Sequence, residues 1–369
     1  MNTTEVDEKL HAEHGVICSM PDDRFGYFGW PSVGRLGDGT LLAGASGMRS
    51  HHVGPHGRST IFISRDDGRT WSSPRVVNDT PLDDRDVGVT PVGGQKVLMS
   101  WFSSDHRDRF DDSEDPEVQR GLSWIDDENG QRFVGSWVRT SPDGGDTWEE
   151  PVRVPVTTPH GPIKLRDDNL LYLGKVFGQT MDDLYAGQHG IQAMRGSGDG
   201  KSWEELGRVP LPDDTDVGDY HEPHVAELPS GKLVGMIRFH GGEDLGLEHA
   251  RILMQTESRD GGATWTEARP LPFHAVPPHL MCHSSGKLIM SYGYRQEPCG
   301  QRIAISEDEG QSWRYHYVLR DDGPTGDLGY PCSTELGGGS IFTVYYQKPS
   351  SPDDKCALLC SRWELPEMA

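Results

Sequence analysis

The sequence predicts an all-β protein that folds as a single six-bladed β-propeller. Three observations support this fold class. A short turn motif that ends in tryptophan occurs five times, and six hairpin turns, each followed by an apolar strand, are spread evenly along the 369 residues. The composition, with 46 glycines, 26 prolines and 34% hydrophobic residues, suits many short strands joined by turns.

The repeated turn has the form Ser-x-Asp-x-Gly-x-Thr/Ser-Trp. The aspartate and glycine build a tight turn, the hydroxyl groups bond to local backbone, and the tryptophan packs beneath. We therefore expect a structural role for its acidic residues. The copies are Ser64–Trp71, Ser141–Trp148, Ser258–Trp265, Ser306–Trp313 and the degenerate Ser197–Trp203.

The hairpin turns divide the chain into units of similar length. Their centres lie near residues 38, 93, 168, 230, 285 and 338, which leaves room for four strands in each unit. We interpret residues 1–369 as one domain whose last blade is closed by an N-terminal strand at about 15–20. The predicted blades span about 25–80, 86–155, 160–212, 220–273, 276–321 and 328–365.

The segment 103–135 lengthens the second unit. It is polar, acidic and without a regular period, which predicts a long loop. Such an insertion can be a lid over a site or a plain solvated loop, and the sequence favours neither.

Charge and cysteine content exclude several classes of protein. The formal net charge of −23 repels nucleic acid and anionic membranes, and no apolar run is long enough for a membrane helix. The six cysteines contain no Cys-x-x-Cys pair, so we expect neither a zinc site nor another metal or cofactor. With no signal peptide visible, the sequence favours a cytoplasmic protein, and nothing in it indicates an oligomeric state.

Polar residues gather where the innermost hairpins open. In a propeller both open ends of such a hairpin lie on one face, so residues at equal distances before and after the turn are neighbours. Around the turn at residue 230, this geometry pairs Glu222 with Arg238. Ordinary strand ends carry serine, threonine or glycine, whereas these ends carry acids, bases and a phenol. They predict a binding site in the central funnel.

The same rule identifies candidates in every blade. On the first strands they are Trp30, Arg85 or Asp86, His160, Glu222, Pro277 with His279 nearby, and Tyr330. On the return strands they are Ser46 or Arg49, Trp101, Lys175 or Val176, Arg238, Tyr294 or Arg295, and Gln347. A structural alternative stays open, in which Tyr330 caps a strand, Glu222 accepts its hydrogen bond and Arg238 forms a salt bridge to that carboxylate.

Nearly the whole chain resembles the sialidase (neuraminidase) superfamily. The tryptophan turns look like its Asp-boxes, and Glu222-Pro-x-x-x-Glu227-Leu with Arg238 resembles the segment that carries the nucleophile's glutamate partner and a substrate-binding arginine. Gly329-Tyr330 resembles the segment of the tyrosine nucleophile. The resemblance implies a Tyr/Glu pair, because a phenol with a pKa near 10 needs a carboxylate to accept its proton.

The chain departs from the family at three places. The family's first arginine is replaced at Trp30. The loop after the first hairpin has His51 and His52 near the place of the family's acid/base aspartate, so the acid/base candidates are these histidines and Asp86. Two residues are candidates for the third arginine of the family, Arg295 and Arg302.

These observations favour an exo-glycoside hydrolase that acts on an acidic or deoxy sugar within a carbohydrate or glycoconjugate. Two alternatives stay open: a carbohydrate lyase with histidine and tyrosine as base and acid, and a non-catalytic carbohydrate-binding propeller. The scattered histidines fit no metal-ligand spacing. The expected substrate-binding residues are Trp30, Arg85, His160, Lys175, His221, Arg238, His279, Arg295 and Arg302.

Overall fold

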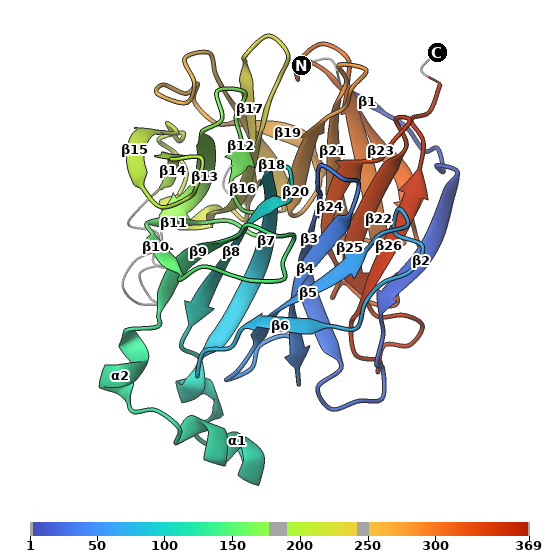
Figure 1. Ribbon diagram of the computed structural model, residues 1–369. Coiled ribbons are helices and arrows are strands. Elements are labelled where there is room, and N and C mark those ends of the chain that lie inside the picture. The colour runs from blue at the N-terminus through green and yellow to red at the C-terminus, as the bar shows by residue number, and fades with distance from the viewer. Residues whose placement is uncertain (1–2, 177–189, 242–250, 368–369) are drawn as a thin grey trace.

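The computed structural model describes residues 3–176, 190–241 and 251–367. The strands of these residues form six sheets around a common axis (Figure 1), which confirms the predicted six-bladed propeller. The inner strands of neighbouring blades contact one another around the ring. The open ends of six inner hairpins therefore meet at one end of this axis.

The first three blades follow the chain from residue 27 to residue 208. The first contains β3 (Tyr27–Arg35), β4 (Leu41–Arg49), β5 (Arg58–Ser64) and β6 (Arg75–Asn78). The second contains β7 (Asp83–Gly93), β8 (Lys96–Ser104), β9 (Gly135–Ser141) and β10 (Val152–Val154). The third contains β11 (Val156–Thr157), β12 (Ile163–Lys164), β13 (Leu170–Val176), β14 (Ile191–Gly196) and β15 (Trp203–Arg208).

The last three blades complete the ring. The fourth begins after the 3-10 helix η2 (Val217–Asp219) and contains β16 (Tyr220–Glu227), β17 (Leu233–Phe239), β18 (Ile252–Ser258) and β19 (Arg269–His274). The fifth contains β20 (Pro278–Cys282), β21 (Leu288–Tyr294), β22 (Gly300–Ser306) and β23 (Trp313–Arg320). The sixth contains β24 (Gly329–Glu335), β25 (Ile341–Gln347) and β26 (Ala357–Trp363).

The N-terminal residues join the last two blades. β2 (Ala12–Cys18) pairs antiparallel with β26 as the outer strand of the sixth blade. β1 (Thr3–Glu5) pairs parallel with β23 of the fifth blade. Backbone hydrogen bonds of residues 3–18 therefore tie both blades to the start of the chain.

The insertion after β8 is not the long loop without helices that the sequence predicts. It contains a 3-10 helix, η1 (Arg107–Phe110), and two short helices, α1 (Pro116–Leu122) and α2 (Asp127–Gln131), which project from one end of the propeller in Figure 1. Pro116 suits the first turn of a helix, where its missing N–H is not needed. Asp126 caps α2 by accepting a hydrogen bond from the backbone N–H of Asn129 at 2.8 Å. These local signals were too short to outweigh the absence of a period.

The tryptophan turns close on themselves through hydrogen bonds. In the first copy, the Ser64 hydroxyl accepts from the N–H of Gly68 at 2.9 Å, and the Asp66 carboxylate accepts from the N–H and hydroxyl of Thr70 at 2.9 and 2.6 Å. The copies that start at Ser141, Ser258 and Ser306 repeat these bonds. The acidic residues are thus engaged within their own turns.

The hydrophobic core lies between adjacent blades. One cluster joins the first and sixth blades and includes Phe62 and Phe342. The Trp71 ring lies 5.7 Å from that of Phe342, so the turn of one blade packs against the next. Such contacts fix the blades around the axis and hold the open hairpin ends in place.

Candidate active site

Four inner strands share one backbone irregularity near their open ends. Trp30, Asp86, Glu222 and Tyr330 have φ angles of 53°, 55°, 45° and 51°, a left-handed conformation that is uncommon outside glycine. At each of them the register with the second strand shifts, as in a β-bulge. The bulge breaks the alternation of side chains along the strand, and all four side chains line the same cavity.

This central cavity has a volume of about 370 Å3 and draws residues from four blades. It brings together one phenol, two carboxyl groups, three arginines and four histidines. Its lining residues are Trp30, His52, Val53, Arg85, Asp86, Phe102, His106, Arg109, His221, Glu222, Arg238, His240 and Tyr330.

Tyr330, Glu222 and Arg238 form one hydrogen-bonded group on the wall of the cavity. The Tyr330 hydroxyl donates to Oε1 of Glu222. Nη1 of Arg238 donates to Oε2 of Glu222 at 2.5 Å and lies 3.2 Å from the Tyr330 hydroxyl. Tyr330 comes from the sixth blade and the other two from the fourth, so the fold joins residues that are far apart in sequence.

The electrostatics of this group fix its protonation. Burial alone would raise the pKa of Glu222, but the Arg238 charge and the Tyr330 hydrogen bond lower it to about 2. Burial, and then the Glu222 charge, raise the pKa of Tyr330 well above its usual value. At neutral pH the pair is therefore a carboxylate and a neutral phenol, as a base and a nucleophile require.

Asp86 faces the same cavity with a different environment. Its side chain is buried, and within the described residues its carboxyl group makes no hydrogen bond or ion pair. Burial, and then the negative charge of Glu222, raise its pKa to about 7. A carboxyl group that keeps its proton up to about this pH can donate it to a substrate.

His52 lies at the rim of the cavity and is held by two partners. Its Nδ1 is 2.9 Å from Oδ1 of Asp327 and 2.8 Å from the Tyr27 hydroxyl, which itself donates to Asp327 at 3.0 Å. An aspartate that orients a histidine in this way is a common arrangement for a general base. His51 is exposed and is not among the lining residues.

Trp30, which the sequence comparison placed at the position of the sialidase superfamily's first arginine, has cations beside its ring. The guanidinium groups of Arg85 and Arg49 are 4.0 and 4.9 Å from the centre of its ring. Both arginines also bind Asp83, which is fully buried. The site thus keeps positive charge at this wall through Arg85, although Arg49 lies behind it.

Lys175 lies beside the cavity rather than among its lining residues. Its Nζ donates to the Gly218 carbonyl at 3.2 Å and is 3.3 Å from Nδ1 of His221, which does line the cavity. Burial lowers the pKa of Lys175 to about 8 and, together with the Lys175 charge, that of His221 to about 4. At neutral pH His221 is therefore uncharged.

Two further candidates belong to a buried histidine cluster outside the lining. His160 and His279 lie with His224, at ring distances of 4.4 to 5.6 Å. Nδ1 of His224 accepts from the N–H of Leu280 at 3.0 Å, which leaves the proton on Nε2. Burial lowers the pKa of all three, so the cluster is neutral and packs the interior of the ring.

The two candidate third arginines differ in position. Arg295 donates to the Leu328 carbonyl at 2.9 Å, and its guanidinium lies 5.9 Å from the Tyr330 ring centre. Arg302 is buried in β22, donates to the carbonyls of Arg320 and Pro298 at 2.6 and 3.0 Å, and does not line the cavity. Arg295 is not among the lining residues either, but of the two it is the one close to the phenol.

Sequence reasoning missed several residues of the site. His106 and Arg109 come from the insertion, which was treated as one polar loop. His240 follows β17 and accepts a hydrogen bond from Nε of Arg238 at 2.6 Å. Asp327 precedes the Tyr330 strand, and only its position just before the proposed nucleophile could have marked it.

Comparisons with known proteins agree with this fold and its repeats. The model of a family described as a BNR repeat-like domain matches residues 123–343, which is more than half of the chain. The chain therefore belongs to the BNR repeat-like domain family, whose six-bladed fold it shares with sialidases. A search of curated proteins finds no match.

Three solved structures illustrate the similarity. A Dyadobacter fermentans protein of unknown function is 21% identical, with a TM-score of 0.74 over 96% of this chain and 98% of that one. The intramolecular trans-sialidase of Ruminococcus gnavus is 14% identical, with a TM-score of 0.63 over 95% and 97%. An α-L-arabinanase of Penicillium chrysogenum is 16% identical, with a TM-score of 0.62 over 97% and 100%.

The described residues contain neither a cluster of metal ligands nor a membrane-spanning helix. Across residues 3–176, 190–241 and 251–367, histidine, cysteine, aspartate and glutamate form no group of three or more that could hold a metal ion. In the same part of the chain, no helix is long and apolar enough to span a membrane.

Proposed function

We propose that this protein is a glycoside hydrolase in which Tyr330 attacks the anomeric carbon of a sugar bound in the central cavity. The observation that carries the proposal is the hydrogen bond from the Tyr330 hydroxyl to Glu222, whose other oxygen binds Arg238. The sialidases and arabinanase among the structural neighbours support glycoside chemistry on this fold.

The reaction follows from the protonation of the three acidic groups. As Tyr330 forms a bond to the anomeric carbon, Glu222 accepts the phenolic proton and Asp86 gives its proton to the departing oxygen. A water molecule then attacks the glycosyl-tyrosine, Asp86 takes a proton from that water, and Glu222 returns its proton to the phenolate. Both carboxyl groups end the cycle in their starting states.

Of the two expected substrates, an acidic sugar and a deoxy sugar, the charges around the cavity favour the acidic one. Arg85, Arg109 and Arg238 line the cavity in a chain whose net charge is −23. Arg109 makes no ion pair within the described residues, so its charge is available to a substrate. A neutral phenol also does not repel an anionic sugar, as a carboxylate nucleophile would.

A lyase reaction is the second candidate, and His52 is the observation that favours it. Its Nδ1 is held by Asp327 and Tyr27 at the cavity rim. A histidine held in this way can remove a proton next to a carboxyl group. The bond to the departing oxygen would then break, with Tyr330 giving that oxygen a proton, and an unsaturated sugar would remain.

Products released from a panel of aryl glycosides that includes sialosides and uronides separate these functions. We expect a reducing sugar, and we expect Tyr330→Phe to lower kcat on the best substrate by about 10³-fold or more, because it removes the nucleophile. The matched control is Tyr346→Phe, since Tyr346 packs 5.9 Å from Tyr330 without lining the cavity.

Three results would contradict the proposal. Unchanged hydrolysis by Tyr330→Phe would remove the tyrosine from the mechanism. An unsaturated product that absorbs in the near ultraviolet would favour the lyase, and sugar binding without turnover would favour a carbohydrate-binding propeller.

A further inference from the structure

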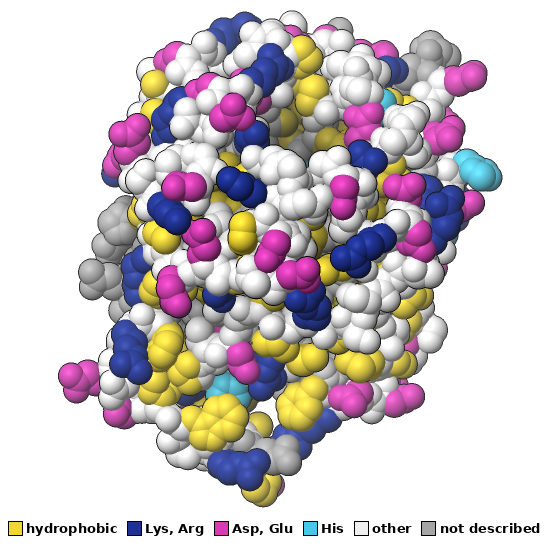
Figure 2. All heavy atoms as spheres, viewed as in Figure 1, with side chains coloured by type: hydrophobic (Ala, Val, Ile, Leu, Met, Phe, Trp, Pro, Cys, Tyr) yellow, Lys and Arg dark blue, Asp and Glu magenta, His cyan; other side chains and the backbone are white. Residues whose placement is uncertain are grey.

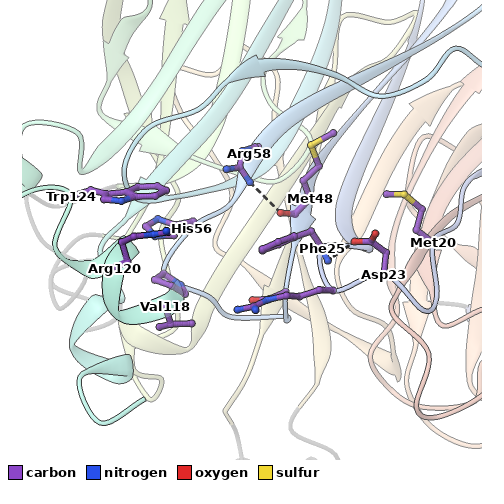
Figure 3. A pocket seen from close by; sticks show the side chains of 12 residues that line it. Met20, Asp23, Phe25, Met48, His56, Arg58, Val118, Arg120 and Trp124 are labelled. Carbon is purple, nitrogen blue, oxygen red and sulfur yellow. Dashed lines mark hydrogen bonds between the residues drawn. The ribbon is translucent and has the colours of Figure 1, made fainter. Parts of the chain in front are cut away.

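A second pocket of about 400 Å3 lies outside the central cavity (Figure 3). Three segments form it: the residues before β3, the loop between β4 and β5, and the insertion around α1. Its lining residues are Met20, Asp23, Arg24, Phe25, Met48, Ser50, Pro55, His56, Arg58, Val118, Arg120 and Trp124.

The second pocket shares two walls with the central cavity. In the loop after β4, His52 and Val53 line the central cavity, whereas Pro55 and His56 line the second pocket. In the insertion, residues 106 and 109 line the central cavity, whereas residues 118–124 contribute to the second pocket. These two segments therefore contribute residues both to the central cavity and to the second pocket.

The surface of the second pocket is aromatic and apolar. Trp124 and Phe25 are 58% and 45% exposed, and they are two of the four large hydrophobic residues that the described part of the chain exposes. The rings of His56 and Trp124 stack 5.0 Å apart, and Figure 3 shows them facing each other on one side of the pocket. Figure 2 shows hydrophobic side chains gathered at this end of the molecule. Such surfaces commonly bind a ligand.

Among the described residues, two of the three arginines that line the second pocket are paired with carboxylates and one is not. Three arginines line it against one aspartate, Asp23. Arg24 is paired with Asp115 at 2.5 Å and Arg58 with Asp79 at 3.2 Å. Arg120 makes no ion pair within the described residues, and in Figure 3 it lies beside His56 at the stacked rings. A negative group would find its charge partner there.

We propose that the second pocket binds a planar aromatic group that carries a negative charge. In the reaction proposed above, this group is the part of the substrate beyond the cleaved bond, and only this role rests on the proposed function. Stacking against Trp124 and Phe25 holds the ring, and Arg120 binds the anion.

Binding of 8-anilinonaphthalene-1-sulfonate, followed by its fluorescence, tests the second pocket without any turnover. We expect Trp124→Ala to weaken its Kd by about 10-fold and Arg120→Gln by about 5-fold. The matched control is Val76→Ala, which removes another exposed apolar side chain, 44% exposed, on β6. Equal Kd values for the parent, Trp124→Ala and Arg120→Gln would overturn the proposal.

Turnover tests the role in the substrate. We expect Trp124→Ala to lower the ratio of kcat/KM for an aryl glycoside with an anionic ring to that for the methyl glycoside by about 10-fold, and Val76→Ala to keep the ratio. An unchanged ratio in Trp124→Ala would remove this role. If the dye binds as expected and no glycoside is cleaved, the proposed function fails while the second pocket stands.

Discussion

The two ends of the propeller differ in which structural features recur from blade to blade. At the end with the tryptophan turns, both backbone and side chains recur: Asp66, Asp143 and Asp260 accept the same two hydrogen bonds from a threonine four residues later. At the open end, only the backbone bulge recurs. Its four left-handed positions carry Trp30, Asp86, Glu222 and Tyr330, four different chemistries.

This difference separates structural from functional repetition. A turn that must close on itself needs the same atoms in every copy. A bulge that only has to point a side chain toward the axis does not require the same functional group in each copy. Its left-handed conformation away from glycine is a strain often found at functional sites. The varied end of a repeat is thus where chemistry can be placed.

Among the changes that test this difference between the two ends, Asp86→Asn should have the largest effect on activity. It keeps the bulge and removes the acid, so we expect kcat to fall by about 10² to 10³-fold near pH 5 on substrates with poor leaving groups. Because Asp86 has a pKa of about 7, the parent should lose kcat/KM above this pH, and the variant should lack that loss. The pH profile of kcat/KM measures both.

The Asp86→Asn variant should also differ from the parent in how its free energy of unfolding depends on pH. Between the ordinary pKa of 3.8 and the folded value of about 7, the unfolded chain has lost a proton that folded Asp86 keeps. Folded parent protein is therefore destabilised as the pH rises through this window, and Asp86→Asn should be relatively more stable at pH 8 than at pH 4.

Asp84→Asn is the matched control for Asp86→Asn. Burial also raises the pKa of Asp84 to about 7, but Asp84 accepts from Asn78 and Thr80 and does not line the cavity. Asp84→Asn should change the free energy of unfolding, but its kcat/KM should still fall above about pH 7, as in the parent. An alkaline loss that persists in Asp86→Asn would reject this acid.

An intermediate effect on activity is expected at one of the two candidate arginines, Arg295, and none at the other, Arg302. Arg295→Gln should lower kcat/KM by about 10-fold, because a cation beside Tyr330 is lost. Arg302→Gln should leave kcat/KM within about twofold and lower the free energy of unfolding by about 2 kcal/mol, because buried carbonyls lose their donor. Steady-state kinetics and urea unfolding distinguish the two, and the reverse pattern would place Arg302 in the site.

The smallest effect on activity is expected at the tryptophan turns. A Cβ at Gly68, where φ is 80°, would lie 2.3 Å from the Phe342 ring of the sixth blade, whereas a Cβ at Gly231, where φ is 84°, would meet nothing within 4 Å. Gly68→Ala should therefore lower the free energy of unfolding by about 3 kcal/mol and Gly231→Ala by about 1. Both should keep kcat/KM; a loss of activity in Gly68→Ala would end the separation.

The sequence predicted the fold because both repeats are local. A turn with fixed hydrogen-bonding residues and a regular spacing leave their marks in short stretches, so the six blades could be counted. The same spacing identified Glu222, Arg238 and Tyr330 as residues at open hairpin ends, which the structure brings into contact.

The rest of the site depends on contacts between distant parts of the chain, which no short sequence motif indicates. His106 and Arg109 lie at the 3-10 helix η1 of the insertion, which brings them to the cavity. Asp327 becomes important only because it meets His52 and Tyr27 of the first blade. The rule also selected His160, which lies in the turn between β11 and β12, and His279 on β20; both side chains belong to the buried histidine cluster instead. The position of a residue in the sequence predicted which blade it belongs to, whereas the packing of the blades decides which way its side chain points.

The pairing of β2 with β26 sets an order for completing the ring. His14 and Ser361 on these strands lie 2.9 Å apart, although 347 positions separate them in the chain. During synthesis β2 is among the first strands made. It cannot pair with β26 until nearly all the other strands have been synthesised. A chain released before β26 would leave β2 without its partner and the sixth blade with an open strand edge, a surface prone to aggregation.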